Sequence, residues 1–165
     1  MNNCRCFREF KIILGREEDY KIFKDILNKG KHPVFIGRDM YANNARNGGA
    51  QLYEYEDEIV AVSLVNPHYG ILLVLNVAPE HRGHGMGEAV LNYLMPNYIR
   101  ALESKIEYFR KRGYVCIGEM KKGRSLNTQV MARSNLFQLA GRLRKIYQSS
   151  SDQNPTTTDG RKCSK

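Results

Sequence analysis

The sequence predicts a mixed α/β (α+β) domain, and three observations support this fold class. First, short apolar runs typical of strands recur among segments whose apolar residues have helical spacing. Second, Gly, Pro and Asn separate these segments and mark turns. Third, a length of 165 residues and an apolar fraction of 42% are those of one folded domain with its own core. The predicted order is strand, helix, loop, three strands, helix, strand, helix and two strands.

The N-terminal part predicts one strand and one helix. Residues 7–15 contain an apolar run and form the first predicted strand. In residues 17–27 the apolar positions share one helical face, acidic residues fill the first turn, and Gly30 follows as a stop signal. Further on, residues 32–36 predict a short element, and residues 43–49, rich in Asn and Gly, predict a loop.

The middle of the chain predicts a hairpin, a central strand and a helix. Residues 50–56 and 59–65 are two strand-like runs on either side of a polar turn, which is typical of a β-hairpin. Residues 71–77 are apolar on both faces, as expected of a central strand. A helix begins near residue 85 and must end before Pro96, because Pro disfavours helical backbone in the residue that precedes it.

The last part of the domain predicts three more strands and a short helix. Residues 98–102 predict a strand, and residues 104–112 predict a helix with a serine cap and Gly113 as its exit. The final strands are expected at residues 114–118 and 128–132, joined by a basic loop.

An added basic amphipathic helix is predicted at residues 134–147, after the domain of residues 1–133. Its apolar residues share one face: Leu136, Leu139, Leu143 and Ile146. This face would pack on the domain or on a second copy of the chain in a homodimer, and contact with nucleic acid or with a membrane is the alternative. Residues 148–165 have no apolar pattern, so we expect a disordered tail.

The positive charge is concentrated in one part of the chain. Residues 1–99 carry 11 Lys or Arg and 12 Asp or Glu, whereas residues 100–147 carry 12 and 3. Such asymmetry predicts an anionic partner. Nucleic acid bound through residues 100–147 and a polyanionic cofactor both fit, as does a solvated basic face.

Composition also bounds the cellular context. No apolar run approaches the roughly 18 residues needed to cross a bilayer, and the N-terminus lacks the apolar segment of a secretory signal. We therefore expect a cytoplasmic protein that does not bind membranes. The spacing of the cysteines fits no zinc site, so we expect reduced thiols and no metal. They are Cys4, Cys6, Cys116 and Cys163.

The most informative segment is residues 77–87, Val-Ala-Pro-Glu-His-Arg-Gly-His-Gly-Met-Gly. Three alternate glycines lie between a predicted buried strand and a predicted helix. Backbone N–H groups at the start of a helix attract anions, and glycines allow close approach. The spacing differs from the dinucleotide-binding turn, Gly-x-Gly-x-x-Gly, and the Gly-Lys-Ser/Thr of a P-loop is missing. The segment therefore predicts a site for a diphosphate.

The same segment resembles the acetyl-CoA signature of the GCN5-related N-acetyltransferases, the GNAT family. Their pattern, Gln/Arg-x-x-Gly-x-Gly/Ala, follows a strand that ends in Val-x-Pro. Arg82, Gly85 and Gly87 fill the pattern, and Val77 and Pro79 precede it.

A second segment strengthens the resemblance. Residues 108–114, Tyr-Phe-Arg-Lys-Arg-Gly-Tyr, are similar to a later landmark of the family, an aromatic pair followed by polar residues and Gly-aromatic. The resemblance implies the acyl-CoA N-acyltransferase fold, with a mixed, mostly antiparallel central sheet flanked by helices. It implies acetyl-CoA as acyl donor and an amine-bearing protein or small molecule as acceptor. The resemblance also implies which residues bind this acyl carrier, acetyl-CoA: Asn76, Val77, Arg82, Gly83, His84, Gly85, Met86 and Gly87.

The catalytic residues depart from the family pattern. Many members have a Glu where this chain has Ile71, and a Tyr acid where it has Phe109. Tyr108 is the neighbouring candidate acid, although an offset of one residue rotates a helical side chain by about 100°.

Candidate bases lie on the hairpin and in the turn that follows it. Glu54 and Glu56 are expected to share a strand face, since side chains alternate along a strand. His68 or Tyr69 in the turn before the central strand is the other candidate, and a water chain is a further alternative.

Three functions stay open at this point. The first is acetyl-CoA-dependent N-acetylation of a primary amine. The second is a GNAT-fold protein that acts on or binds nucleic acid, and the third is a non-catalytic acyl-CoA-binding module. The loops around residues 28–50 and 119–128 are expected to select the acceptor.

Overall fold

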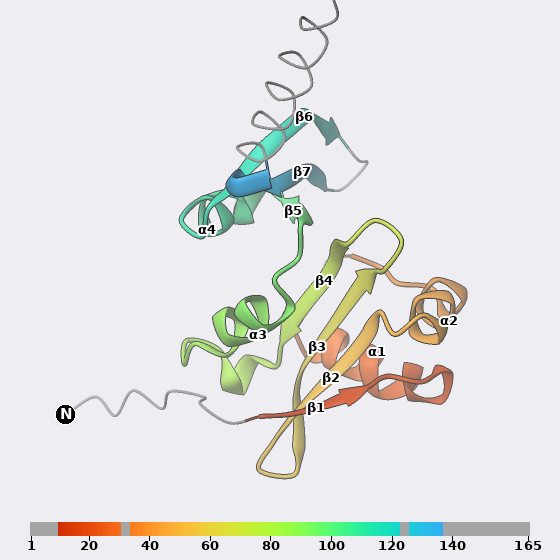
Figure 1. Ribbon diagram of the computed structural model, residues 1–165. Helices are drawn as coiled ribbons and strands as arrows, with labels where there is room; N and C mark the ends of the chain where they lie inside the picture. Colours follow the sequence, from red (N-terminus) through yellow and green to blue (C-terminus); the bar gives the residue numbers. More distant parts are fainter. Residues whose placement is uncertain (1–9, 31–33, 123–125, 137–165) are drawn as a thin grey trace, which may run out of the picture. The chain divides into compact units, whose positions relative to one another are not determined.

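A seven-stranded sheet organises the part of the chain that the structure describes, residues 10–30, 34–122 and 126–136 of a computed structural model (Figure 1). All neighbouring strands are antiparallel except β4 and β5, which are parallel. The predicted mixed, mostly antiparallel sheet is therefore confirmed, with β4 at its centre. In sheet order, the strands are β1 (Lys11–Leu14), β2 (Ala50–Tyr55), β3 (Glu58–Asn66), β4 (Ile71–Val77), β5 (Tyr98–Leu102), β7 (Asn127–Arg133) and β6 (Tyr114–Lys122).

The chain divides into two units, Met1–Arg133 and Ser134–Lys165. Of the second unit the structure describes only residues 134–136, which are helical. The rest of the helix predicted at residues 134–147, and the tail predicted at residues 148–165, lie outside the described residues. None of the described helices is both long enough and apolar enough to cross a membrane.

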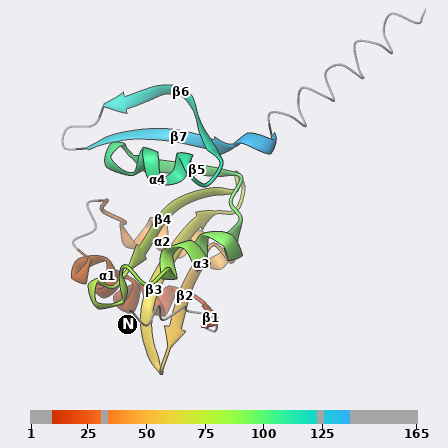
Figure 2. The ribbon, with the colours of Figure 1, turned by 90° about the vertical axis from the view of Figure 1, so that its left-hand side faces the viewer.

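Helices cover both faces of the first four strands (Figure 2). On one face, α1 (Tyr20–Lys29) and α2 (Arg38–Arg46) bury Phe23 and Tyr41, whose ring centroids lie 4.8 Å apart, against β2, β3 and β4. On the other face, α3 (Met86–Leu94) packs Val90 next to Tyr53 of β2. Full burial of each such side chain contributes about 1.5–3 kcal/mol. The short α4 (Ile106–Arg110) packs on β5, β6 and β7.

The sheet opens between β4 and β5. These strands pair only at their first residues, Ile71 with Tyr98 and Leu72 with Ile99, and then separate (Figure 1). A register shift between β3 and β4 makes Leu73 the extra residue of a β-bulge. From there to the end of β4, the backbone edge that faces β5 has no strand partner among the described residues. The opening therefore lies beside the strand that leads into the glycine turn.

Two local predictions for the segment that precedes β3 are wrong. Residues 43–49 were expected to form a loop, but α2 extends to Arg46, because Tyr41 and Ala45 bury one helical face. Glu56 does not share a strand face with Glu54, because β2 ends at Tyr55 and Glu56 lies in the turn with a φ of 51°.

The short helix near residue 106 also begins differently from the prediction. Ser104 was expected to cap it, but Ser104 lies in a 3₁₀ turn, η3 (Glu103–Lys105), and α4 has no side-chain cap. Gly113 has a φ of 81° after the helix, so its predicted role as the exit residue is confirmed.

Candidate active site

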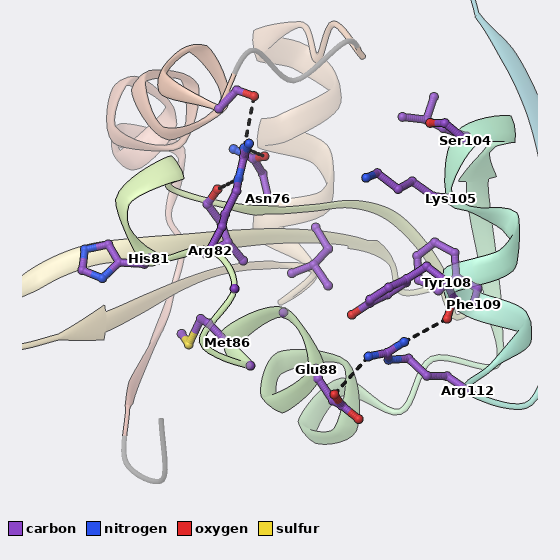
Figure 3. A pocket seen from close by; sticks show the side chains of 17 residues that line it. Asn76, His81, Arg82, Met86, Glu88, Ser104, Lys105, Tyr108, Phe109 and Arg112 are labelled. Carbon is purple, nitrogen blue, oxygen red and sulfur yellow. Dashed lines mark hydrogen bonds and ion pairs between the residues drawn. The ribbon is translucent and has the colours of Figure 1, made fainter. Parts of the chain in front are cut away.

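A cavity of about 800 Å³ lies between the end of β4, the start of α3 and the α4 region (Figure 3). One wall holds the predicted carrier residues, all of which line the cavity except His84. The opposite wall holds residues from η3 and α4 that the sequence did not assign to a carrier. The lining residues are Gly30, Leu75, Asn76, Val77, His81, Arg82, Gly83, Gly85, Met86, Gly87, Glu88, Leu102, Ser104, Lys105, Tyr108, Phe109 and Arg112.

The glycine turn presents open backbone to this cavity. Gly83 and Gly85 have φ values of 78° and 87°, a conformation in which an L side chain is strained. A Cβ atom at either position would meet nothing within 4 Å, so the space above them is accessible. Gly85 is also the N-cap of α3, and as a glycine it has no side chain with which to cap that helix. The first N–H groups of α3 are therefore suited to an anion.

Arg82 fixes the turn in place. Its Nε donates to the Val77 carbonyl oxygen at 2.9 Å, and its Nη2 donates to Gly30 O at 3.1 Å and to Asn76 Oδ1 at 3.3 Å. A Cβ on Gly30 would lie 2.6 Å from this Nη2, so only Gly allows the approach. The Arg82 side chain thereby joins the end of α1 to the end of β4.

The Asn76 side chain belongs to the same network. Asn76 is buried, and its Nδ2 donates to the Ile26 carbonyl oxygen at 2.8 Å. The same carbonyl oxygen also accepts from the backbone N–H of Gly30 at 3.1 Å, so Asn76 adds a second bond at the C-terminal end of α1. Asn76 therefore orients its amide toward α1, and only its backbone is left to bind a carrier.

The other predicted carrier residues have different environments. Met86 is 1% exposed and packs into the core beneath α3. A Cβ on Gly87 would lie 3.7 Å from the Tyr108 Oη and from Val77 Cγ2, so the start of α3 and the Tyr108 hydroxyl lie near each other. His84 is exposed and does not line the cavity, whereas His81, which was not predicted, does.

Tyr108 is held by Arg112. The Arg112 guanidinium lies over the Tyr108 ring, with Cζ 3.7 Å from the ring centroid, and donates to Tyr108 O and to Glu88 Oε2, both at 3.0 Å. Glu88 is on α3, so this ion pair connects the two walls of the cavity (Figure 3). Burial raises the pKa of the Tyr108 hydroxyl, with a smaller opposing effect from Arg112. The hydroxyl is therefore a hydrogen-bond donor at neutral pH.

A second, smaller cavity of about 70 Å³ lies at the opening between β4 and β5. Phe109 lines both cavities, whereas Tyr108 lines only the larger one. The two aromatic side chains thus have different positions, with Tyr108 near the glycine turn and Phe109 where the cavities meet. The lining residues of the smaller cavity are Val34, Leu72, Leu73, Val74, Leu75, Ile99, Arg100, Ala101, Leu102, Lys105 and Phe109.

Comparison with solved structures relates this geometry to known proteins. The chain is similar to Naa50 from Arabidopsis thaliana, solved with the bisubstrate analogue CoA-Ac-MVNAL, with a TM-score of 0.61 and 18% identity over 76% of this chain and 98% of that one. It is similar to the ribosomal-protein-S18-alanine N-acetyltransferase from Escherichia coli, with a TM-score of 0.60 and 13% identity over 76% and 93% of the two chains. The chain has the GNAT fold. Comparisons with protein-family models and with curated proteins give no match.

A third solved structure agrees. Ard1 from Thermoplasma volcanium has a TM-score of 0.58 and 15% identity over 75% of this chain and 96% of that one. The fold that the sequence resemblance implied is therefore confirmed, while the low identities leave activity and substrate to be argued from the site itself.

The predicted bases lie outside both cavities of this GNAT fold. Glu54 forms an ion pair with Lys11 of β1 at 2.9 Å, and Glu56 is exposed in the β2–β3 turn. His68 is exposed in the β3–β4 turn, where its backbone N–H donates to Asn66 Oδ1 at 3.1 Å. None of these three predicted bases lines either cavity.

One acidic cluster could hold a metal ion by its geometry. Glu58, Glu80 and His81 each offer a ligand atom, all within 4.8 Å of one another. However, Lys29 Nζ lies 3.6 Å from a carboxylate oxygen of both glutamates. The pKa of Glu80 is lowered, first by its own backbone N–H and then by Lys29 and His81. The cluster is best described as an ion-pair network that joins α1 to the β2–β3 hairpin.

Proposed function

We propose that this protein is an acetyl-CoA-dependent N-acyltransferase that acetylates a primary amine. The observation that carries this proposal is the open glycine turn at the start of α3, inside a cavity of about 800 Å³ and beside the unpaired edge of β4. Few acyl carriers have both a diphosphate that fits the glycine turn and a thin chain that fits the adjoining opening in the sheet. CoA has a diphosphate, an extended amide-containing arm and a terminal thioester.

The residues present fit CoA at each of these parts. The N–H groups of Gly83, Gly85 and Gly87 would hold the diphosphate, since nothing obstructs the first two. The unpaired edge of β4 would hydrogen-bond the amides of the arm, as an added strand does. Glu88 is the one carboxylate among the described residues that line this cavity, and it is paired with Arg112. The remaining charge is cationic and suits a polyanion.

The acyl transfer would take place where the two cavities meet. The carrier supplies an activated thioester, and a neutral amine attacks its carbonyl carbon while the carbon–sulfur bond breaks. No Asp, Glu or His lines the smaller cavity among the described residues. We therefore assign removal of the amine proton to water, which is an adequate base for amines of modest pKa.

Tyr108 was the candidate acid, and we propose a binding role for it instead. Its hydroxyl lies close to Gly87, near the site proposed for the diphosphate, rather than at the junction of the cavities. It would donate a hydrogen bond to the carrier. Phe109 at the junction has no proton to offer the leaving thiolate.

Calorimetry with acetyl-CoA and matched glycine variants tests the proposed function. We expect Gly85→Glu to weaken acetyl-CoA binding at least tenfold, because a carboxylate enters the anion site. Gly48→Glu is the control, since Gly48 also has an open surrounding and a positive φ of 73° but lies at the end of α2. Equal loss in both variants, or no loss in either, would contradict the assignment.

A non-catalytic acyl-CoA-binding module is the second candidate function. The absence of a hydroxyl at Phe109 and of a carboxylate or imidazole among the described residues of the smaller cavity favours it. Thioester cleavage measured with a panel of amines separates the two, because turnover of any amine excludes a purely binding role. The nucleic-acid contact predicted for residues 100–147 and the predicted homodimer are tested neither by the described residues nor by the comparisons, and they stay predictions.

A further inference from the structure

The smaller cavity has two chemically different walls. One wall is aliphatic and consists of residues from β4 together with Val34. The other comes from β5 and η3 and includes two cations, Arg100 and Lys105. Four residues line both cavities and mark the place where the proposed acyl donor and acceptor would meet: Leu75, Leu102, Lys105 and Phe109.

These two cations have no carboxylate partner among the described residues. Lys105 forms no ion pair there, and its side chain extends into the larger cavity (Figure 3). Arg100 Nε donates to the hydroxyl of Thr128 at 3.4 Å, which leaves its charge uncompensated. The adjacent Glu103 accepts a hydrogen bond from Asn127 and lines neither cavity.

We infer that the acceptor is a small amine carrying a carboxylate or phosphate group close to its amino group, and that Lys105 and Arg100 bind this anion. The inference rests on the proposed function and names its substrate class. The distance between amine and anion must be short, because both cations line the same cavity of about 70 Å³ that adjoins the reacting end. A site with two unpaired cations also disfavours an acceptor that carries a second positive charge.

The same charges explain how an amine could react without a protein base. Nearby positive charge lowers the pKa of an amino group, because the ammonium form is repelled. The neutral, nucleophilic form is then more populated at neutral pH. The anion would hold the acceptor in place while its amine attacks the carbonyl carbon, the carbon–sulfur bond breaks and the amine proton passes to water.

The test uses the full chain, acetyl-CoA and matched pairs of acceptors. The carboxylate pair is glycine and glycinamide, the phosphate pair is phosphoethanolamine and ethanolamine, and ethylenediamine is the cationic acceptor. We expect kcat/KM for one or both anionic acceptors to exceed that of the neutral partner about ten- to a hundredfold, as for a hydrogen bond to a charged group. Which pair shows the difference identifies the anion as carboxylate or phosphate.

Charge reversal tests the assignment to Lys105. We expect Lys105→Glu to abolish or reverse the preference for the anionic partner of each pair. Lys111→Glu is the control, because Lys111 is an exposed residue at the end of α4 that lines neither cavity. This variant should keep the acceptor preference of the parent chain. The KM for acetyl-CoA is measured separately, so that an effect on the donor is distinguished from one on the acceptor.

A binding measurement gives a result even if every acceptor in the panel is turned over too slowly to measure. With CoA present, NMR should show N-acetylglycine or N-acetylphosphoethanolamine binding more tightly than N-acetylglycinamide. A preference for neutral or cationic compounds, or an unchanged preference in Lys105→Glu, would overturn the inference alone. Failure of the chain to bind acetyl-CoA at all would overturn the proposed function and this inference with it.

Discussion

At the scale of single residues, two adjacent aromatic side chains have separate positions. Tyr108 is stacked against Arg112 and directs its hydroxyl toward the start of α3, whereas Phe109 lies at the junction of the two cavities. The offset of one residue along α4 therefore separates the side chain near the glycine turn from the side chain between the two cavities. In the proposed function, Tyr108 would contact the carrier and Phe109 would face the thioester.

Two substitutions test this division. Tyr108→Phe is expected to weaken acetyl-CoA binding about three- to tenfold with little change in kcat, since one hydrogen bond to the carrier is lost. Phe109→Tyr is expected to raise kcat with little change in the KM for acetyl-CoA, because it adds a proton donor beside the leaving sulfur. Steady-state kinetics with acetyl-CoA as the varied substrate measures both. A fall in kcat alone for Tyr108→Phe would instead make Tyr108 the acid.

At the scale of elements, the glycine turn depends on a helix distant in sequence. Arg82 binds the carbonyl of Gly30 at the end of α1 as well as Val77 O at the end of β4. The turn proposed to hold the diphosphate is thus fixed partly by α1, a helix that is distant from it in the sequence. A change at the end of α1 should therefore reach the carrier site.

Gly30→Ala tests this coupling. The added Cβ would lie 2.4 Å from Asn76 Nδ2 and 2.6 Å from Arg82 Nη2, so we expect the network to be displaced. The variant should lose about 1–3 kcal/mol of unfolding free energy and bind acetyl-CoA more weakly. In the control, Gly37→Ala, a Cβ would meet only Phe35 Cε1 at 3.8 Å. Thermal unfolding and calorimetry should separate the two, and identical behaviour would argue against the coupling.

The sequence predicted the parts of the fold that depend on local patterns, and it missed parts that depend on tertiary packing. The limits of β4 were predicted to the residue, because seven consecutive apolar or amide residues lie between two turns. The helix α2 was missed, because its Asn-rich sequence favours a loop and only the burial of Tyr41 and Ala45 stabilises the helix. Tertiary packing overrode local propensity there.

The candidate site shows the same limit. The glycine turn is contiguous and was recognised, whereas Lys105, Arg100 and Arg112 enter the cavities only because β5 separates from β4. The strand pairing that opens the sheet is a long-range property. The basic character of residues 100–147 was the one sequence signal that pointed to these side chains, and it indicated an anionic partner without locating the site.

At the scale of the whole molecule, buried tyrosines set the alkaline limit of stability. Burial raises the pKa of the Tyr41, Tyr53 and Tyr108 hydroxyls above the ordinary value of about 10. Above that pH the unfolded chain loses protons that the folded chain retains. Stability should therefore be unaffected by these groups below about pH 9 and fall above pH 10, by up to about 1.4 kcal/mol per pH unit for each of the fully buried Tyr41 and Tyr53.

Unfolding by urea as a function of pH measures this dependence. Tyr41→Phe should reduce the slope above pH 10 and cost little at pH 7, because the buried Tyr41 hydroxyl has no hydrogen-bond partner among the described residues. Tyr69→Phe is the control, since Tyr69 is 69% exposed. A slope that is the same in both variants would show that burial of Tyr41 does not govern the alkaline transition.

The central claim is that backbone N–H groups between β4 and α3 bind the diphosphate of CoA. Titration of the ¹⁵N-labelled chain with CoA, followed by amide chemical shifts, tests it most directly. We predict the largest saturable shifts at the amides of Gly83, Gly85 and Gly87, with smaller shifts along β4. Binding that leaves these three amides unchanged, or no binding at all, would contradict the account.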